Sequence, residues 1–394
     1  MVSMSALADP GWLDIEQLTA RAKAWAATME GHRGSGTDRL STPFRQAHAE
    51  EPNSLGARQP LLRKEREELE TAQLAPGATR ALDAGHRATP EEPDPVRTCF
   101  ERDRDRILHS SAYRRLAGKT QVFVFPTDHQ RTRLTHALEV AQIARSIAKA
   151  SRANESLAEA IALGHDCGHG PGGHASEDAL APFLEGGFDH AVWGADVTLV
   201  SLNLCLETLD GIRNHSWSRP VPATPEGEIV SWADRIAYVC HDFEDAAHVG
   251  IVNRADLPAV VRERCGTSRS SQLNAFVLGV VEAISTTGRI GMTESTAEAL
   301  VAFRQWNYQQ IYLRPAARRQ GEAVVSLLRA LVTYFAERPL RLRVDVDPGS
   351  AEARHSAVSY VSGMTDRFAC ELAVTELGWD RSRLPQGIGL PSSE

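Results

Sequence analysis

Residues 162–174 read ALGHDCGHGPGGH, and this stretch decides how the rest of the chain is interpreted. The adjacent His165 and Asp166 end a run of small and apolar residues, and a glycine-rich turn follows them. Leu157 and Ile161 precede His165 at intervals of four residues, which is the spacing of one helix face. The pattern predicts a helix in which His165 is buried and Asp166 lies near the end. The glycines that follow terminate this helix.

Two further stretches place a polar side chain on an inward helix face. In RTRLTHALEV, His136 begins a stripe of apolar residues that recur at helical offsets of four, three and four. In SWADRIAYVCHDFEDA, Asp234 is surrounded by small and apolar residues at helical spacing. We therefore expect both side chains to meet the His165–Asp166 pair in the protein interior, from three different helices.

Together these four side chains have the composition of a divalent cation site. A single histidine on an apolar face is ordinarily a hydrogen-bonded core residue. The metal-site interpretation therefore depends on the combination of two histidines with two aspartates. Burying two carboxylates is costly, and a cation held between them and two imidazoles removes that cost. The donors suit one octahedral ion such as manganese, magnesium, iron or nickel, whereas structural zinc favours thiolates. The predicted metal ligands are His136, His165, Asp166 and Asp234.

A second pair of polar residues follows the glycine-rich turn. His174 and Glu177 are three residues apart and share a face if the segment is helical. A carboxylate beside an imidazole fixes its tautomer and raises its basicity, as general acid–base catalysis requires. The alternative is a helix-start histidine bridged to a surface glutamate. The position of His174, eight residues after Asp166, favours catalysis.

Further residues at helical spacing suggest a substrate cavity. Tyr238 and Asp242 follow Asp234 at intervals of four residues, so they share its stripe and could hydrogen-bond a sugar. The alternative is a half-buried helix with a solvated acidic end. Arg133 lies one turn before His136 and can bind a phosphate with two donors, whereas Arg131 is equally compatible with a surface position.

Helical periodicity dominates the chain from about residue 96 onward. We expect a mostly α fold in which residues 1–95 form a partly irregular arm and residues 96–394 form the compact helical domain with a C-terminal helical extension. Alternating β-branched runs are scarce. The best strand candidates are residues 121–125 and 341–346, which predict at most one small hairpin.

Composition restricts the class of protein further. The net charge of −8 gives no reason to expect nucleic-acid binding, although local arginines can still bind a polyphosphate. The six cysteines form no Cys-x-x-Cys motif and are expected to be free thiols. No segment has the length and apolar character of a signal peptide or membrane span. We expect a cytoplasmic protein without a membrane partner.

Five stretches in this order resemble the HD-domain metallohydrolases, and more closely their deoxynucleoside triphosphate triphosphohydrolases, the dGTPase group. They lie within residues 102–369 and read RDRILHSSAYRRLAGKTQVF, RTRLTHALEVAQIARSIA, ALGHDCGHGPGGHASED, WADRIAYVCHDFEDA and YVSGMTDRFA. The His-Asp pair alone is a weak signal, whereas five ordered stretches are specific. The resemblance implies an HD-domain helical fold for most of the compact region.

The resemblance also implies roles for individual residues. His136, His165, Asp166 and Asp234 match the metal ligands, and His174 with Glu177 matches the catalytic histidine and acid. Arg133 matches a phosphate-contacting arginine, and Tyr238 and Asp242 match substrate-contacting positions. The implied reaction splits a deoxynucleoside triphosphate into deoxynucleoside and tripolyphosphate. The family further implies homo-oligomers, often tetramers or hexamers, sometimes with a nucleotide activator.

Two departures from the family pattern concern the site. Gly172 stands where the glycine-rich turn usually has phenylalanine, which changes the rigidity expected of that loop. The polar set that usually follows GGF is replaced by DHAVW at 189–193, in which His190 is the residue expected to point into the site and contact substrate.

Three hypotheses follow. The leading one is a metal-dependent dNTP triphosphohydrolase of the dGTPase-like group. The second is an HD phosphohydrolase that acts on nucleoside monophosphates or signalling nucleotides and releases orthophosphate or pyrophosphate. The third is a nucleotide-binding regulatory protein without turnover, and the presence of every ligand and acid–base position argues against it.

Overall fold

The computed structural model describes residues 19–28, 31–33, 44–50, 52–56, 58–126 and 129–387. The chain divides into two compact units, Met1–Pro60 and Leu61–Glu394. The described part of the first unit contains helix α1 (Ala20–Ala26) and an antiparallel pair of two-residue strands, β1 (His32–Arg33) and β2 (Arg45–Gln46).

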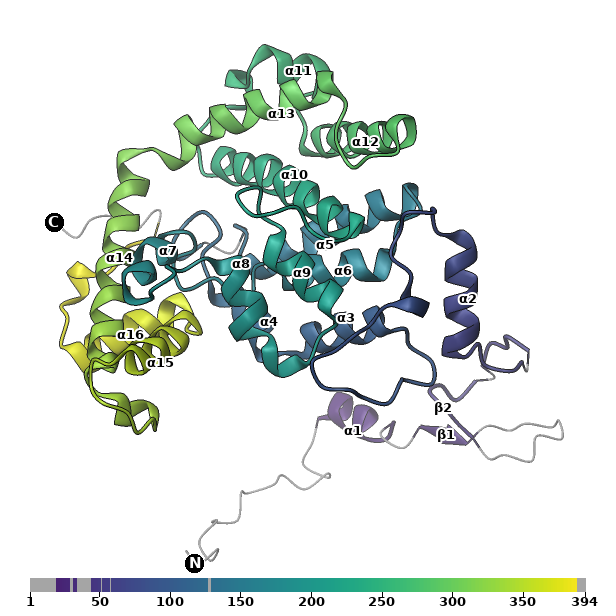
Figure 1. The fold of residues 1–394 in the computed structure, drawn as a ribbon, viewed down its shortest axis with the longest axis horizontal. Coiled ribbons are helices and arrows are strands. Elements are labelled where there is room, and N and C mark those ends of the chain that lie inside the picture. The colour runs from purple at the N-terminus through teal and green to yellow at the C-terminus, as the bar shows by residue number, and fades with distance from the viewer. Residues whose placement is uncertain are drawn as a thin grey trace, which may run out of the picture. The chain divides into compact units, whose positions relative to one another are not determined.

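The second unit is built from helices, as Figure 1 shows, so the expected mostly α fold is confirmed. Two π-helical turns, Gly194–Thr198 and Tyr308–Tyr312, extend two of these helices. No described helix is both long and apolar enough to cross a lipid bilayer. The α-helices are α2 (Arg63–Gln73), α3 (Cys99–His109), α4 (Ser111–Arg115), α5 (Arg133–Ala150), α6 (Glu155–Gly164), α7 (Ala175–Leu180), α8 (His190–Trp193), α9 (Leu206–Asn214), α10 (Pro225–His248), α11 (Ala259–Cys265), α12 (Arg269–Thr287), α13 (Glu294–Asn307), α14 (Pro315–Ala336), α15 (Ala351–Ser362) and α16 (Asp366–Leu377).

Both strand candidates of the sequence analysis are wrong. Residues 121–125 form bends, because Phe123 packs with Ala246 and Ile311 whereas Phe125 packs against a different apolar cluster. Val122 and Phe123 belong to one apolar cluster and Val124 and Phe125 to another, so the segment bends between them and does not pair in a sheet. Residues 341–346 begin within a short 3-10 turn and continue without strand pairing, and their side chains alternate between exposed and half-buried.

The helices α5, α6 and α10 pack against one another and carry the predicted metal ligands. The predicted apolar stripe of α5 is fully buried. Helix α6 begins at Asn154, whose side chain accepts hydrogen bonds from two backbone N–H groups of its first turn. Helix α10 begins at Pro225 and is capped by Thr224, which accepts from Gly227 N. Local sequence thus fixes where each ligand-bearing helix starts.

The larger unit has two main apolar cores. One lies among α3, α5, α6 and α10, and the other lies among α7, α8 and the C-terminal helices α14, α15 and α16 (Figure 1). The helices α15 and α16 are separated by a corner at residues 363–365. Residues 165–174 run from the first core to the second, so the glycine-rich turn connects the two.

Candidate functional site

The structure brings the four predicted metal ligands together. The Nε2 atom of His136 on α5 lies 3.0 Å from Oδ1 of Asp234 on α10. The Nε2 atom of His165, at the end of α6, lies 3.6 Å from the same oxygen and 3.5 Å from Oδ1 of Asp166. The donor atoms of His136, His165 and Asp234 lie within 4.8 Å of one another, and Asp166 forms a second such group with His165 and His215.

The hydrogen bonds of His165 suit a metal ligand. Its Nδ1 donates to the carbonyl oxygen of Ala162 at 2.6 Å, which leaves the Nε2 lone pair facing the carboxylates. This Nε2 is buried and has no hydrogen-bond partner among the described residues. Burial opposes a charge on His165, but the carboxylates of Asp166 and Asp234 outweigh burial and raise its pKa to about 9. A pocket that attracts a proton in this way also attracts a cation, which competes for the same lone pair.

Arg133, the predicted phosphate ligand, is buried beside this cluster. Its Nη1 donates to Oδ2 of Asp166 at 2.6 Å, while its Nε and Nη2 have no partner within the described part of the chain. Burial opposes the charge on Asp166, yet Arg133 and the neighbouring imidazoles hold the pKa of that carboxyl well below its usual range. Two guanidinium donors thus remain unpaired in the centre of the site.

The predicted acid–base pair also forms. His174 precedes α7, and its Nδ1 lies 3.5 Å from Oε2 of Glu177, one turn into the helix. The other oxygen of Glu177 lies 2.5 Å from Nδ1 of His190. Glu177 is therefore shared by two imidazoles. Burial opposes its charge, but these hydrogen bonds hold the pKa of Glu177 well below its usual range.

His174, Glu177 and His190 also form a second group of potential metal donors with His169. The rings of His169 and His190 are stacked, with centroids 3.7 Å apart and an angle of 17° between their planes. Lone pairs in two nearly parallel planes do not converge on one point, so this group is less suited to bind an ion. The side chain of His174 is 75% exposed, which suits proton exchange with a substrate or water.

Sequence reasoning missed two buried histidines of the site. His169 Nε2 lies 3.2 Å from Oδ1 of Asp166, and burial together with Arg133 holds the pKa of His169 well below its usual range. His215 follows α9, and its Nε2 lies 3.3 Å from Nε2 of His190. His169 lies within residues 162–174, three residues after Asp166, and this spacing could have indicated that the two side chains meet. His215 has no comparable motif around it.

The predicted substrate residues Tyr238 and Asp242 line α10 beyond Asp234, and each has a partner that the sequence did not suggest. The hydroxyl of Tyr238 accepts a hydrogen bond from Nε of Arg304 on α13 at 2.8 Å. Asp242 is buried and accepts from the hydroxyl of Tyr312, in the π-helical turn after α13. Burial raises the pKa of Asp242 to about 8. The alternative of a solvated acidic helix end is therefore wrong for this residue.

Two more arginines lie close to the predicted site residues in the sequence. Arg131 is not a surface residue, because its guanidinium binds Glu139, Glu244 and Asp245 and thereby ties the start of α5 to α10. Arg235, next to Asp234, is stacked at 3.8 Å on the ring of Trp217 and has no carboxylate partner in the described ranges. Burial lowers the pKa of Arg235, which indicates that it lacks a compensating anion.

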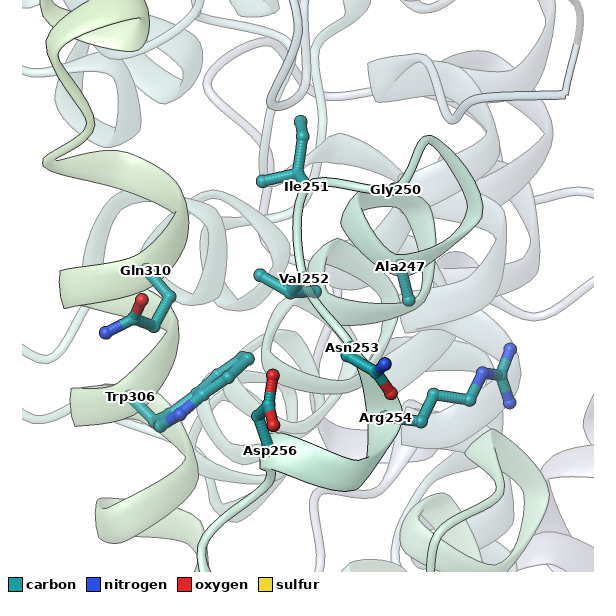
Figure 2. Close-up of a pocket in the computed structure, with 9 residues that line it drawn as sticks. All are labelled: Ala247, Gly250, Ile251, Val252, Asn253, Arg254, Asp256, Trp306 and Gln310. Atoms are coloured by element: carbon teal, nitrogen blue, oxygen red, sulfur yellow. The ribbon is translucent and has the colours of Figure 1, made fainter.

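One pocket lies apart from the predicted metal ligands. It has a volume of about 790 Å³ and is lined by the end of α10, residues 250–256, and Trp306 and Gln310 from α13 and the turn after it, as Figure 2 shows. None of the predicted site residues lines this pocket. The convergence of donors, and not cavity size, therefore identifies the candidate site.

Comparison with known proteins agrees with this geometry. Residues 133–239 match the HD domain, and residues 290–374 match the phosphohydrolase-associated domain. The chain is 41% identical to a deoxyguanosinetriphosphate triphosphohydrolase-like protein of Caldanaerobacter subterraneus, over 77% of this chain and 92% of that one. Proteins with the same description from Clostridium perfringens and Desulfatibacillum aliphaticivorans are 40% and 36% identical, over 71% and 78% of this chain and 86% and 95% of theirs.

Proposed function

Since the chain belongs to the HD-domain family of deoxyguanosinetriphosphate triphosphohydrolase-like proteins, we propose that this hydrolase splits deoxynucleoside triphosphates into deoxynucleoside and tripolyphosphate. The observation that carries the proposal is the convergence of His136, His165 and Asp234 near Arg133, whose Nε and Nη2 have no partner among the described residues. A phosphate held there would lie between the cation site and an arginine.

The donor set fits a divalent metal. His136, His165, Asp166 and Asp234 would hold it, and the buried Nε2 of His165, which lacks a partner among the described residues, is the donor that most clearly awaits an ion. When bound, such a cation supplies positive charge that polarises the α-phosphate towards attack by water. Two nitrogen and two oxygen donors suit manganese, magnesium, iron or nickel.

The chain's own residues would then carry the remaining work. Water attacks the α-phosphorus, the bond from phosphorus to the 5′-oxygen breaks, and the proton lost by water ends on that oxygen. His174 is placed to move this proton, because it is exposed to the site and Glu177 fixes its tautomer. Arg133 would neutralise charge that develops on the phosphate oxygens.

The arginines favour a triphosphate over a monophosphate. Arg133 has two unpaired donors, Arg235 has no carboxylate partner in the described chain, and Arg304 contacts only the hydroxyl of Tyr238 and the face of another tyrosine. If the three guanidinium groups face one bound substrate, they offer more donors than a single phosphate can use. Tyr238 and Asp242, next to Arg304, would then contact the deoxyribose.

The test is hydrolysis of each of the four deoxynucleoside triphosphates by the purified protein with manganese, with tripolyphosphate, pyrophosphate and orthophosphate resolved by ion chromatography. We expect tripolyphosphate and deoxynucleoside in equal amounts from at least one substrate. The absence of tripolyphosphate from all four, in protein that is folded and contains metal, would falsify the proposal. Orthophosphate or pyrophosphate as product would instead support the second hypothesis.

A further inference from the structure

The corner between α15 and α16 contacts the segments that carry the residues of the candidate site. Asp366, the first residue of α16, is buried, and its carboxylate accepts three hydrogen bonds. One oxygen accepts from the backbone N–H of Thr120 at 2.9 Å and from its hydroxyl at 2.5 Å. The other oxygen accepts from the backbone N–H of Gly172 at 2.8 Å. One side chain thus links two segments that are far apart in the sequence.

The first linked segment is the glycine-rich turn before His174. Gly172 and Gly173 both have positive φ, at +74° and +66°, a conformation that glycine adopts without a steric penalty. Glycine also leaves a turn free to leave this conformation, so an external contact is needed to hold it. The N–H of Gly172 receives that contact from Asp366, two residues before the imidazole that we assign to proton transfer.

The second linked segment leads into Arg133. Thr120 pairs with Thr132 in an isolated β-bridge, and the carbonyl oxygen of Lys119 accepts from the backbone N–H of Arg133 at 3.3 Å. Residues 119–120 therefore set where α5 begins. By holding Thr120, Asp366 also holds the start of the helix that carries Arg133.

Ser362, at the end of α15, adds two contacts to the same frame. Its carbonyl oxygen accepts from Nζ of Lys119 at 2.9 Å, and that ammonium also donates to the carbonyl oxygen of His169 at 2.5 Å. Its hydroxyl accepts from Nε1 of Trp193 at 3.1 Å, on the helix that begins with His190. The corner therefore contacts all three segments that bear His174, Arg133 and His190.

We propose that Asp366 is a positioning residue that fixes the catalytic turn and the start of α5 relative to each other. The inference rests on the proposed function, because it assigns Asp366 to the placement of His174 and Arg133. The hydrogen bonds of the Asp366 carboxylate go to Thr120 and Gly172, and not to the predicted metal ligands or the acid–base pair. Its loss should therefore reduce turnover and leave metal binding in place.

Asp366→Asn is the first test. The amide keeps the shape of the carboxylate, but its NH2 group must face either Thr120 or Gly172, whose N–H groups now donate to Asp366. Two donors cannot bond each other, so one of the two links breaks. We expect kcat for tripolyphosphate release to fall about 10- to 100-fold, because small misplacement of a catalytic group has effects of that order. KM should change by less than about threefold, and metal content should equal that of the wild type.

Hydrogen exchange supplies a readout that does not depend on activity. In Asp366→Asn, amides of residues 169–174 should exchange about tenfold faster, while those of α6 should be unchanged. Asp380→Asn is the matched control, since this exposed carboxylate caps a short turn through Ser382 N and touches no site segment. A wild-type protein that is inactive on every substrate would refute the proposed function and still allow this test.

Thr120 provides a second, milder pair of variants in case Asp366→Asn fails to fold. Thr120→Val removes only the hydroxyl donor, and Thr120→Ser retains it. We expect Val to raise exchange in the turn and to lower kcat about threefold, and Ser to restore both. Unchanged exchange at residues 169–174 in both Asp366→Asn and Thr120→Val would overturn the proposal, as would loss of metal in proportion to loss of kcat.

Discussion

Arg133 and Asp166 form a direct ion pair at the buried centre of the site, with 2.6 Å between Nη1 and Oδ2. One residue was predicted to bind phosphate and the other to bind metal, and the structure shows that they also bind each other. The pair therefore couples the two halves of the site. A carboxylate that is predicted to hold a cation is kept ionised by an arginine whose remaining donors have no partner among the described residues.

The first prediction concerns this pair. Arg133→Ala should lower the free energy of unfolding by about 3–5 kcal/mol in metal-free protein, because it removes the guanidinium group that pairs with the buried carboxylate of Asp166. It should also lower kcat/KM about 100-fold or more, since a transition-state contact is lost. Urea unfolding and steady-state kinetics measure the two effects. Arg133→Lys retains charge without the planar fork and should be intermediate, whereas an Ala variant as stable as the wild type would contradict the prediction.

The second prediction separates metal binding from proton transfer. Asp234→Ala removes an oxygen that lies within 3.6 Å of both ligand imidazoles, so metal content should fall. His174→Ala should abolish turnover but leave metal near the wild-type level, because His174 lies outside the group formed by His136, His165 and Asp234. Elemental analysis after gel filtration measures both. Equal loss of metal in the two variants would show that the division of roles is wrong.

The third prediction is a pH dependence caused by Asp242. Burial raises the pKa of this carboxyl from 3.8 to about 8, so the folded protein keeps a proton that the unfolded chain releases. The free energy of unfolding contains the full contribution of protonated Asp242 below about pH 4. This contribution is lost as the pH rises towards 8, because the unfolded state then binds fewer protons than the folded state. Asp242→Asn is neutral throughout. The wild type should lose stability relative to Asp242→Asn between pH 5 and pH 8, and parallel urea-unfolding curves would refute this.

The fourth prediction concerns the stacking of Arg235 on Trp217. Trp217→Leu removes the aromatic face that holds the guanidinium at 3.8 Å. Because a partly exposed cation–π contact contributes about 0.5–2 kcal/mol, KM for a deoxynucleoside triphosphate should rise about 3- to 10-fold with little change in kcat. Trp217→Phe keeps an aromatic face and serves as the control. Equal KM values for the Leu variant and the wild type would show that Arg235 does not contact the triphosphate.

The fifth prediction concerns Gly172, which stands in the turn where the family usually has phenylalanine. A Cβ on Gly172 would lie 2.4 Å from a methyl carbon of Val324 on α14, and φ at this position is +74°. Gly172→Ala should therefore cost about 1–3 kcal/mol of stability. Val324→Ala should relieve the steric part of that cost and not the conformational part. A double-mutant cycle by urea unfolding measures the coupling, and strict additivity of the two substitutions would disprove the contact.

The helical fold and the metal cluster could be predicted because both depend on spacing within single helices. His136 and Asp234 each lie on a stripe whose inward direction is fixed by the period of the helix. Arg304, Tyr312 and His215 could not be found in this way. Their contacts with α10 and α8 depend on how distant helices pack, and no interval in the sequence encodes that approach.

The strand candidates failed for a related reason. The apolar residues of 121–125 divide in consecutive pairs, with Val122 and Phe123 in one apolar cluster and Val124 and Phe125 in another, so the segment bends and does not form a strand. The role of Arg131 was equally hidden, since its carboxylate partners on α10 are more than 100 positions away in the sequence. Local pattern therefore identified side chains that meet in the structure, whereas the residues that orient them emerge only from tertiary structure.

The glycine-rich turn has a consequence for how the protein fails on heating. Metal ligands are anchored in the core around α5, α6 and α10, while His174 begins a helix of the core around α14. Loosening of the C-terminal core would displace the imidazole while the ion stays chelated. Gentle warming should therefore silence hydrolysis reversibly at temperatures where the cation is still retained, so that thermal inactivation precedes demetallation.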